Sequence, residues 1–210
     1  MSDDPYERLR EEIVSGRLQP NERLVEADLV SSLGVRRTAV RAALVRLEHD
    51  GLVEHERNRG AKVRLVAESE AIEILETRAA LESLMARKAA ANVTTDDVAQ
   101  LREILASMRT LLAGSDLLAA SERNVDLHGA IMRIARHRTA ERLVSMLNSQ
   151  LVRFQYRTIL QPGRSERTLG EHEAIVEAIA RGDGDAAEAA MRAHLSQVAE
   201  ALRSAAGAGG

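Results

Sequence analysis

The sequence predicts a mainly α-helical protein made of a small N-terminal domain and a larger, all-α C-terminal domain. Three observations lead to this. Aromatic residues are only 1% of the 210, and the apolar fraction is carried by Ala, Leu, Val and Ile, which favours packed helices. Helical periodicity, punctuated by Gly, runs along most of the chain. Strand-like alternation is confined to a short stretch near residues 52–65.

The N-terminal domain, expected at residues 1–66, contains two short helices separated by a very tight turn. Residues 6–15 are expected to form a first helix and residues 17–24 a connecting loop. Residues 25–33 are amphipathic, Gly34 interrupts them, and a further helix follows at residues 37–50. Two helices joined by a tight turn that contains Gly are typical of a helix-turn-helix.

The second helix of this pair carries arginines that have no apolar role. Arg37, Arg41 and Arg46 lie outside its buried face, and arginines at the start of a recognition helix meet base edges and phosphates in DNA. A turn at residues 57–60 and a returning strand at residues 61–65 add a basic wing. In a chain with net charge −3, this local positive charge indicates binding to double-stranded DNA. The alternative is a solvated charged face on a small helical hairpin.

The order and spacing of these residues resemble the N-terminal domain of GntR-type transcriptional regulators, over residues 6–66. The resemblance is carried by Ser15-Gly16-Arg17-Leu18-Gln19-Pro20, Leu24-Val25-Glu26, Leu33-Gly34-Val35, Arg37-Thr38, Val40-Arg41, Ala43-Leu44, Arg46-Leu47 and Gly51-Leu52-Val53-Glu54. It implies that the DNA contacts come from Arg36, Arg37, Thr38, Arg41, Arg46, Arg59 and Gly60.

This chain departs from the family pattern at several positions. The family usually has Ser at Arg36, Pro at Ala39 and Glu at Ala42. It usually has Gly at Asn21, and Asn can take the same left-handed conformation. Ala27 stands where some members carry a further DNA-contacting Arg.

The C-terminal domain, expected at residues 67–204, is predicted to be an all-α bundle, followed by a flexible tail at 205–210. Thr94 to Asp97 offers a capping box. Gly182 and Asp183 offer a C-cap and an N-cap between the last two helices. The six expected helices span residues 70–92, 95–113, 116–136, 139–160, 165–180 and 185–204.

Three histidines on three different helices of this bundle point toward apolar surroundings: His128, His172 and His194. A single such His is more often a core residue that has found hydrogen-bond partners. Three of them together favour a shared divalent metal, and a His-rich site suits zinc or nickel. Asn124 lies one turn before His128 on the same helix face and completes the predicted ligand set. Such a site should lose its metal as the pH falls toward the imidazole pKa of roughly 6.5 or below.

The bundle resembles the FCD effector domain of the FadR subfamily, in its six-helix form. The motifs are Glu76-Thr77-Arg78-Ala79-Ala80-Leu81-Glu82, Asn124-Val125-Asp126-Leu127-His128, Glu171-His172-Glu173-Ala174-Ile175 and Met191-Arg192-Ala193-His194-Leu195. The family often has Asp or Asn at position 124. The resemblance supports metal binding and implies that Arg78 receives the carboxylate of an effector. The alternative for Arg78 is an ion pair with Glu82, four residues along the same helix.

Together these patterns predict a ligand-responsive transcriptional regulator, most often a repressor in such families. It should be a homodimer on a palindromic operator, because one winged domain reads only a half-site. Its effector should be a small carboxylic acid. The sequence shows no signal peptide, no long apolar span and no Cys, which fits a cytoplasmic protein without a membrane segment. No catalytic motif such as HExxH or a nucleophile elbow occurs, so an enzyme is not expected. The alternatives are a metal-dependent enzyme carrying a DNA-binding domain and a constitutive DNA-binding protein.

Overall fold

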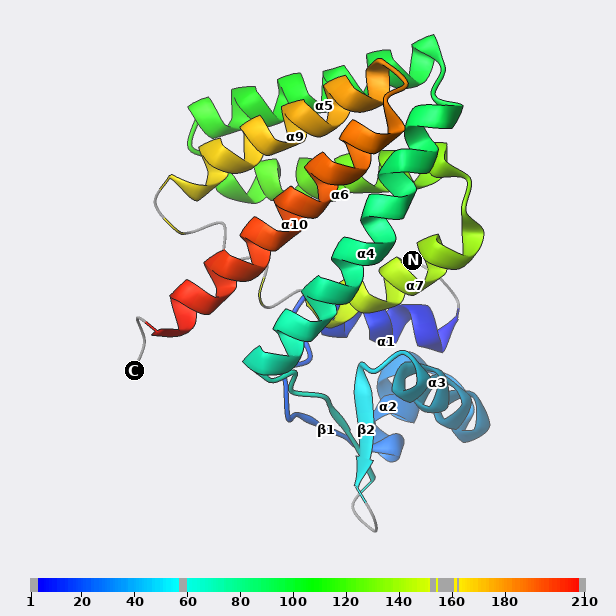
Figure 1. Ribbon diagram of the computed structural model, residues 1–210. Helices are drawn as coiled ribbons and strands as arrows, with labels where there is room; N and C mark the ends of the chain where they lie inside the picture. The colour runs from blue at the N-terminus through cyan, green and yellow to red at the C-terminus, as the bar shows by residue number, and fades with distance from the viewer. Residues whose placement is uncertain (1–3, 57–59, 152–153, 155–160, 162, 208–210) are drawn as a thin grey trace. The chain divides into compact units, whose positions relative to one another are not determined.

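The computed structural model describes residues 4–56, 60–151, 154, 161 and 163–207 (Figure 1). The chain divides into two compact units. The first, called the winged unit here, comprises residues 1–67 together with 146–153. The second, called the helical unit, comprises residues 68–145 and 154–210.

The winged unit contains α1 (Pro5–Val14), α2 (Glu26–Leu33) and α3 (Arg37–His49), as the periodicity predicted. Asp4 caps α1 by accepting the N–H of Tyr6, which provides one of the partners that a helix start lacks. Gly34 ends α2 with φ +69°, a left-handed conformation that Gly adopts without strain. The core of the unit forms where α3 buries one face: Val40, Ala43, Leu44 and Leu47.

A three-stranded antiparallel sheet completes the winged unit. It consists of β1 (Arg23–Leu24), β2 (Val53–Glu56) and β3 (Gly60–Val63) in the order β1-β3-β2. In its register Val53 lies opposite Val63 and Arg23 opposite Lys62. The predicted loop at residues 17–24 is therefore wrong for its last two residues, Arg23 and Leu24, which form β1. A strand of two residues has no periodicity to read, and β1 exists because β3 lies beside it.

Two details of this region bear on the sequence predictions. Asn21 has φ +65°, so the left-handed conformation expected for it is confirmed. The predicted turn at the wing tip, including Arg57 and Arg59, falls on residues 57–59, which lie outside the described residues.

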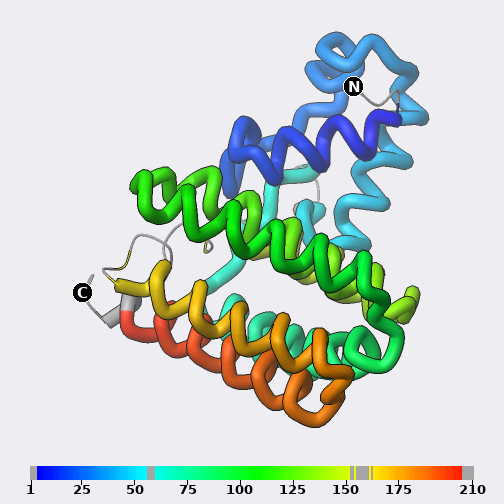
Figure 2. The backbone as a smooth tube through the Cα atoms, turned by 90° about the horizontal axis from the view of Figure 1, so that it is seen from above, coloured from blue at the N-terminus to red at the C-terminus, as the bar shows by residue number. Residues whose placement is uncertain are grey.

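The helical unit is built from long helices (Figure 2). They are α4 (Glu68–Asn92), α5 (Thr95–Ala113), α6 (Leu117–Ala135), α9 (Arg164–Ala180) and α10 (Gly184–Gly207), together with the first part of α7 (Arg138–Gln150). In both views α10 runs beside α4 and α9. The predicted capping box is present, since Thr94 and Asp97 bond to each other's backbone N–H. Asp183 also accepts the N–H of Ala186 at the start of α10.

The predicted helix at residues 139–160 is wrong in its length. α7 ends at Gln150, and Leu151 is not helical. The last residues of α7 belong to the winged unit, where the Ser149 hydroxyl accepts from Arg10 and the Gln150 amide donates to the Asp50 carbonyl at 3.0 Å. The end of α7 coincides with these tertiary contacts, which helical periodicity cannot reveal.

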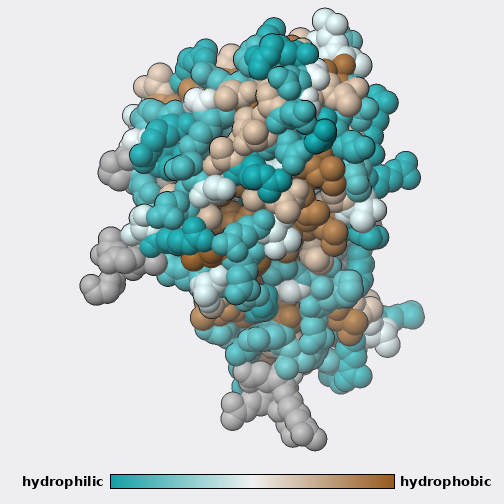
Figure 3. Space-filling model, in the orientation of Figure 1, coloured by the Kyte–Doolittle hydropathy of each residue, from teal (hydrophilic) through white to brown (hydrophobic). Residues whose placement is uncertain are grey.

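Hydrophilic residues cover most of the surface seen in Figure 3, and hydrophobic ones show between them in patches. Among the described residues, no helix is long and apolar enough to cross a membrane.

Candidate metal centre and DNA interface

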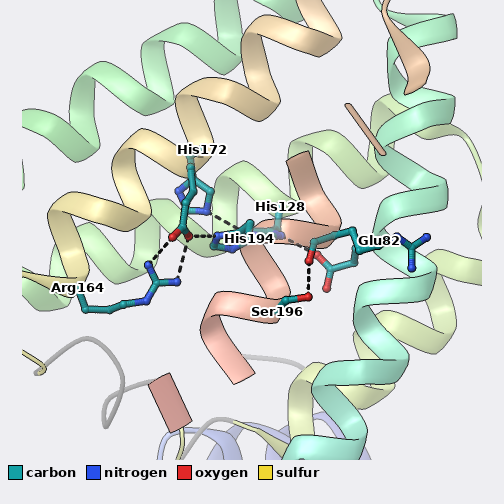
Figure 4. A network of polar contacts seen from close by, with 8 residues as sticks. Glu82, His128, Arg164, His172, His194 and Ser196 are labelled. Atoms are coloured by element: carbon teal, nitrogen blue, oxygen red, sulfur yellow. Dashed lines mark hydrogen bonds and ion pairs between the residues drawn. The ribbon is translucent and has the colours of Figure 1, made fainter. Parts of the chain in front are cut away.

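Three histidines from three helices meet inside the helical unit (Figure 4). His128 on α6, His172 on α9 and His194 on α10 are 5%, 0% and 3% exposed. The ring centres of His172 and His194 lie 4.5 Å apart, and each lies 5.3 Å from that of His128. Each ring offers a nitrogen, and the three atoms lie within 4.8 Å of one another. The packing has thus brought together the three histidines singled out from the sequence.

Two of these histidines hydrogen-bond to carboxylates. His128 Nδ1 lies 2.6 Å from Glu82 Oε2, and His194 Nδ1 lies 2.7 Å from Glu171 Oε2. An ionised carboxylate can only accept a hydrogen bond, so each imidazole carries its proton on Nδ1. The neutral ring then leaves the lone pair of Nε2 available, which is the arrangement found in metal-binding histidines.

Each carboxylate is held in turn by a buried arginine. Arg78 Nε donates to Glu82 Oε1 at 2.7 Å. Arg164 donates two parallel bonds to Glu171, at 2.9 and 3.0 Å. Burial by itself would raise the pKa of Glu82, but Arg78 and His128 outweigh it and lower that pKa to about 2. Burial likewise acts to raise the pKa of Glu171, but bonds from His194 and Arg164 lower it overall. Both carboxylates are therefore ionised at neutral pH.

The third histidine has no such partner. His172 Nδ1 is buried without a hydrogen bond among the described residues, while its Nε2 lies 3.3 Å from His128 Nε2. Two lone pairs would repel at that distance, so without a metal His172 must place its proton on Nε2, which leaves Nδ1 a bare buried acceptor. A separation of about 3.3 Å also matches two nitrogen ligands on one tetrahedral ion with bonds of roughly 2.0–2.1 Å.

Asn124 also has a buried polar atom without a hydrogen-bond partner among the described residues. This atom is its Oδ1, and Asn124 lies one turn before His128 on α6. Buried polar atoms without partners are rare, and a bound ion is one explanation for them. The unpaired Oδ1 of Asn124, the Nε2 atoms of His128 and His172 and a ring nitrogen of His194 therefore fit a metal ion.

Burial keeps the imidazoles of His172 and His194 neutral. It lowers the pKa of His194 to about 4, although the hydrogen bond to Glu171 acts in the opposite direction. Burial, with the neighbouring imidazoles next in size, lowers the pKa of His172 well below its usual value. Protons should therefore displace a metal only at a lower pH than the ordinary imidazole pKa predicts.

Sequence reasoning missed Glu82, Glu171 and Arg164 as parts of this site. It considered Glu82 only as a partner of Arg78, and that ion pair is present. Glu171 precedes His172 directly in sequence but contacts His194, which lies 23 residues further along the chain. A carboxylate near a candidate ligand is a signal that could have been used, although its partner depends on how the helices pack.

The DNA-facing residues lie at the start of α3. Arg36 is the N-cap residue of α3 and makes no side-chain capping bond, and Arg37, Thr38 and Arg41 are exposed with it. Glu26 at the start of α2 accepts from Arg41 Nε at 2.9 and 3.0 Å.

Arg46 does not share this surface. It lies about 180° around α3 from Arg37, pairs with Asp4 at 2.8 Å and stacks over the Tyr6 ring at 3.8 Å. At the start of β3, Gly60 has φ +82°, and a Cβ added to it would meet no atom within 4 Å, so its backbone is open to solvent. Arg59 lies outside the described residues.

The matches to known families agree with this architecture. Residues 2–63 match the family described as bacterial regulatory proteins, gntR family, and residues 73–197, more than half of the chain, match the FCD domain. This protein belongs to the GntR family of regulators with an FCD domain. The family resemblance seen in the sequence is thereby confirmed.

Relatives of this GntR-family chain match most of its length. The HTH-type transcriptional repressor RspR of Escherichia coli K12 is 28% identical over 198 residues, covering 94% of this chain and 87% of that protein. The HTH-type transcriptional regulator LutR of Bacillus subtilis is 29% identical, covering 90% and 95%. The solved structure of E. coli McbR/YncC has a TM-score of 0.78 at 20% identity, covering 97% and 98%, and supports the fold alone.

Proposed function

We propose that this GntR-family chain is a transcriptional regulator, acting as a repressor, whose affinity for its operator is set by a small carboxylate bound beside a metal ion in the helical unit. The observation that carries the proposal is the convergence of His128, His172 and His194, with unpaired buried atoms between helices, in a chain that also has a winged unit. A protein that only bound DNA would have no need of this costly polar cluster in an apolar core.

The winged unit supplies the DNA contacts in this proposal. Arg36, Arg37, Thr38 and Arg41 face the major groove from the start of α3, and Gly60 lets the wing backbone approach the DNA closely. Arg46 is better explained as a residue that fixes α1 to α3, given its contacts with Asp4 and Tyr6. One winged unit reads one half-site, so we propose a homodimer on a palindromic operator in the cytoplasm.

The helical unit supplies the sensor. His128, His172 and His194 would hold the ion with Asn124, and neutral imidazoles suit zinc or nickel. The metal would act as a Lewis acid that attracts the effector's carboxylate. Arg78 holds Glu82 through Nε, and its remaining N–H groups are donors that an effector carboxylate could use.

The proposal is tested with the full-length, tag-free protein. A duplex that it binds specifically is selected from a random DNA library, and its affinity is measured by fluorescence anisotropy at one salt concentration. The measurement is repeated with zinc or nickel and with a panel of small carboxylates. A change in operator affinity with one of these acids, without its consumption, is expected. Consumption of the acid would support a metal-dependent enzyme instead, and indifference to every metal and acid would support a constitutive DNA-binding protein.

The variant Arg78→Ala tests effector binding in the helical unit separately from DNA binding by the winged unit. The variant should bind the selected duplex as tightly as the parent when no effector is present, because Arg78 lies in the helical unit. Its response to the effector should be lost. An unchanged response in Arg78→Ala would remove this arginine from the sensor.

A further inference from the structure

In the part of the chain that the structure describes, the charged groups bonded to the histidine cluster balance one another before any ion binds. Arg78 is matched by Glu82, and Arg164 by the two oxygens of Glu171. The three imidazoles are neutral when they act as ligands, because only a deprotonated nitrogen can bind a metal. Asn124 adds a neutral amide where a carboxylate could stand. A divalent ion held by these residues would therefore keep both of its positive charges.

That excess charge would be buried between helices whose inward faces are otherwise apolar. The helices that carry the histidines also bury Leu127 and Ile131 on α6, Ile175 on α9 and Met191 on α10, each 2% exposed or less. An uncompensated charge is costly in such surroundings, and the cost falls sharply when a counter-ion binds directly beside it. The two carboxylates of the network cannot serve as that counter-ion, because each is bonded to an arginine and to a histidine.

We propose that metal and anion bind this site as a coupled pair, and that Asn124 is the residue that creates the coupling. The inference rests on the metal site of the proposed function and adds what the effector must do there. A small carboxylate supplies the negative charge that the protein ligands withhold, so the ion is held tightly only with the anion present. An aspartate at position 124 would supply that charge permanently and make the anion dispensable.

The coupling determines which small molecules the site distinguishes. By thermodynamic reciprocity, the factor by which the anion tightens metal binding equals the factor by which the metal tightens anion binding. A neutral molecule of the same shape would gain nothing from the metal's charge. The site would therefore distinguish a carboxylate from its amide by charge compensation, and the level of the acid would govern the level of bound metal.

The test uses nickel as the metal, acetate as the anion and acetamide as its neutral counterpart. Nickel affinity of the full-length, tag-free parent is measured by competition with a chromophoric chelator, alone and with each additive. Acetate should tighten nickel binding by about tenfold, within the range usual for coupled sites, and acetamide should leave it unchanged. Acetate affinity measured with and without nickel should change by the same factor.

Two variants locate the effect. Asn124→Asp should bind nickel about tenfold more tightly than the parent without acetate, as expected for a carboxylate replacing an amide near a cation, and should lose most of the response to acetate. Val125→Asp adds the same charge one residue along α6, where the side chain is 53% exposed, and should behave like the parent. Circular dichroism confirms that each variant is folded.

The outcomes separate this inference from the proposed function. Nickel binding by the parent that is equally tight with acetate, with acetamide and with neither overturns the coupling and leaves the metal site standing. A parent that binds no nickel or zinc under any of these conditions overturns both. The comparison of acetate with acetamide in the parent stands even if Asn124→Asp fails to fold.

Discussion

Acidification should destabilise the metal-free protein through its buried histidines. Burial lowers the pKa of His194 to about 4 in the folded chain, whereas the unfolded chain should have the ordinary value of roughly 6.5. As the pH falls, the unfolded chain therefore binds a proton at this residue before the folded chain does. The contribution to the free energy of unfolding is complete above about pH 6.5 and is lost progressively down to about pH 4.

The size of this effect follows from the two pKa values. At about pH 5, His194 alone should lower the free energy of unfolding by ~2 kcal/mol. His172 adds to the loss in the same direction, since burial lowers its pKa as well. Glu82 acts in a different window, because its pKa of about 2 makes its contribution fall away only below the ordinary Glu value near 4.5.

The assay is urea unfolding followed by far-UV circular dichroism, with a chelator present, between about pH 7.5 and about pH 5. His194→Gln should reduce the difference between the two ends of this range by ~2 kcal/mol, the part assigned to His194. His49→Gln, a change at an exposed position, serves as the matched control and should keep the parent's pH dependence. If the parent unfolds at the same urea concentration throughout this pH range, the argument from burial is refuted.

Three further predictions concern DNA binding by the winged unit and metal binding in the helical unit. Arg41→Ala should weaken binding to the selected duplex by about 1–3 kcal/mol at constant salt, the usual contribution of a bidentate contact to guanine, and equal binding would refute the proposed docking. Glu26→Gln should lower the ratio of specific to non-specific DNA affinity, because Glu26 orients Arg41. The control Asp28→Asn makes an equal change of charge in the same helical turn and should leave this ratio unchanged. Fluorescence anisotropy with the selected duplex and with a random duplex gives the ratio for each variant. Glu171→Gln should weaken nickel binding by about 10- to 100-fold, as loss of a carboxylate behind a ligating histidine does, and chelator competition showing parental affinity would remove Glu171 from the site.

Local patterns were enough to predict most of the winged unit and the helices of the bundle. The break at Gly34, the capping box of Thr94 and Asp97, and the left-handed Asn21 all depend on residues within a few positions of one another. The apolar faces of the helices followed from a period that the sequence displays directly. The same period placed His128, His172 and His194 on buried faces, so their burial was also predictable.

Only the tertiary structure decided what those histidines contact. Glu82 and His128 are 46 residues apart, and Glu171 and His194 are 23 apart, so neither pairing leaves a trace in local periodicity. The short strand β1 and the end of α7 escaped prediction for the same reason, since each coincides with contacts to a distant segment. The sequence by itself determined which residues form helices and which faces they bury, because those depend on neighbours along the chain. The identity of each buried polar group's partner was decided by helix packing, because that alone brings distant side chains within hydrogen-bonding distance.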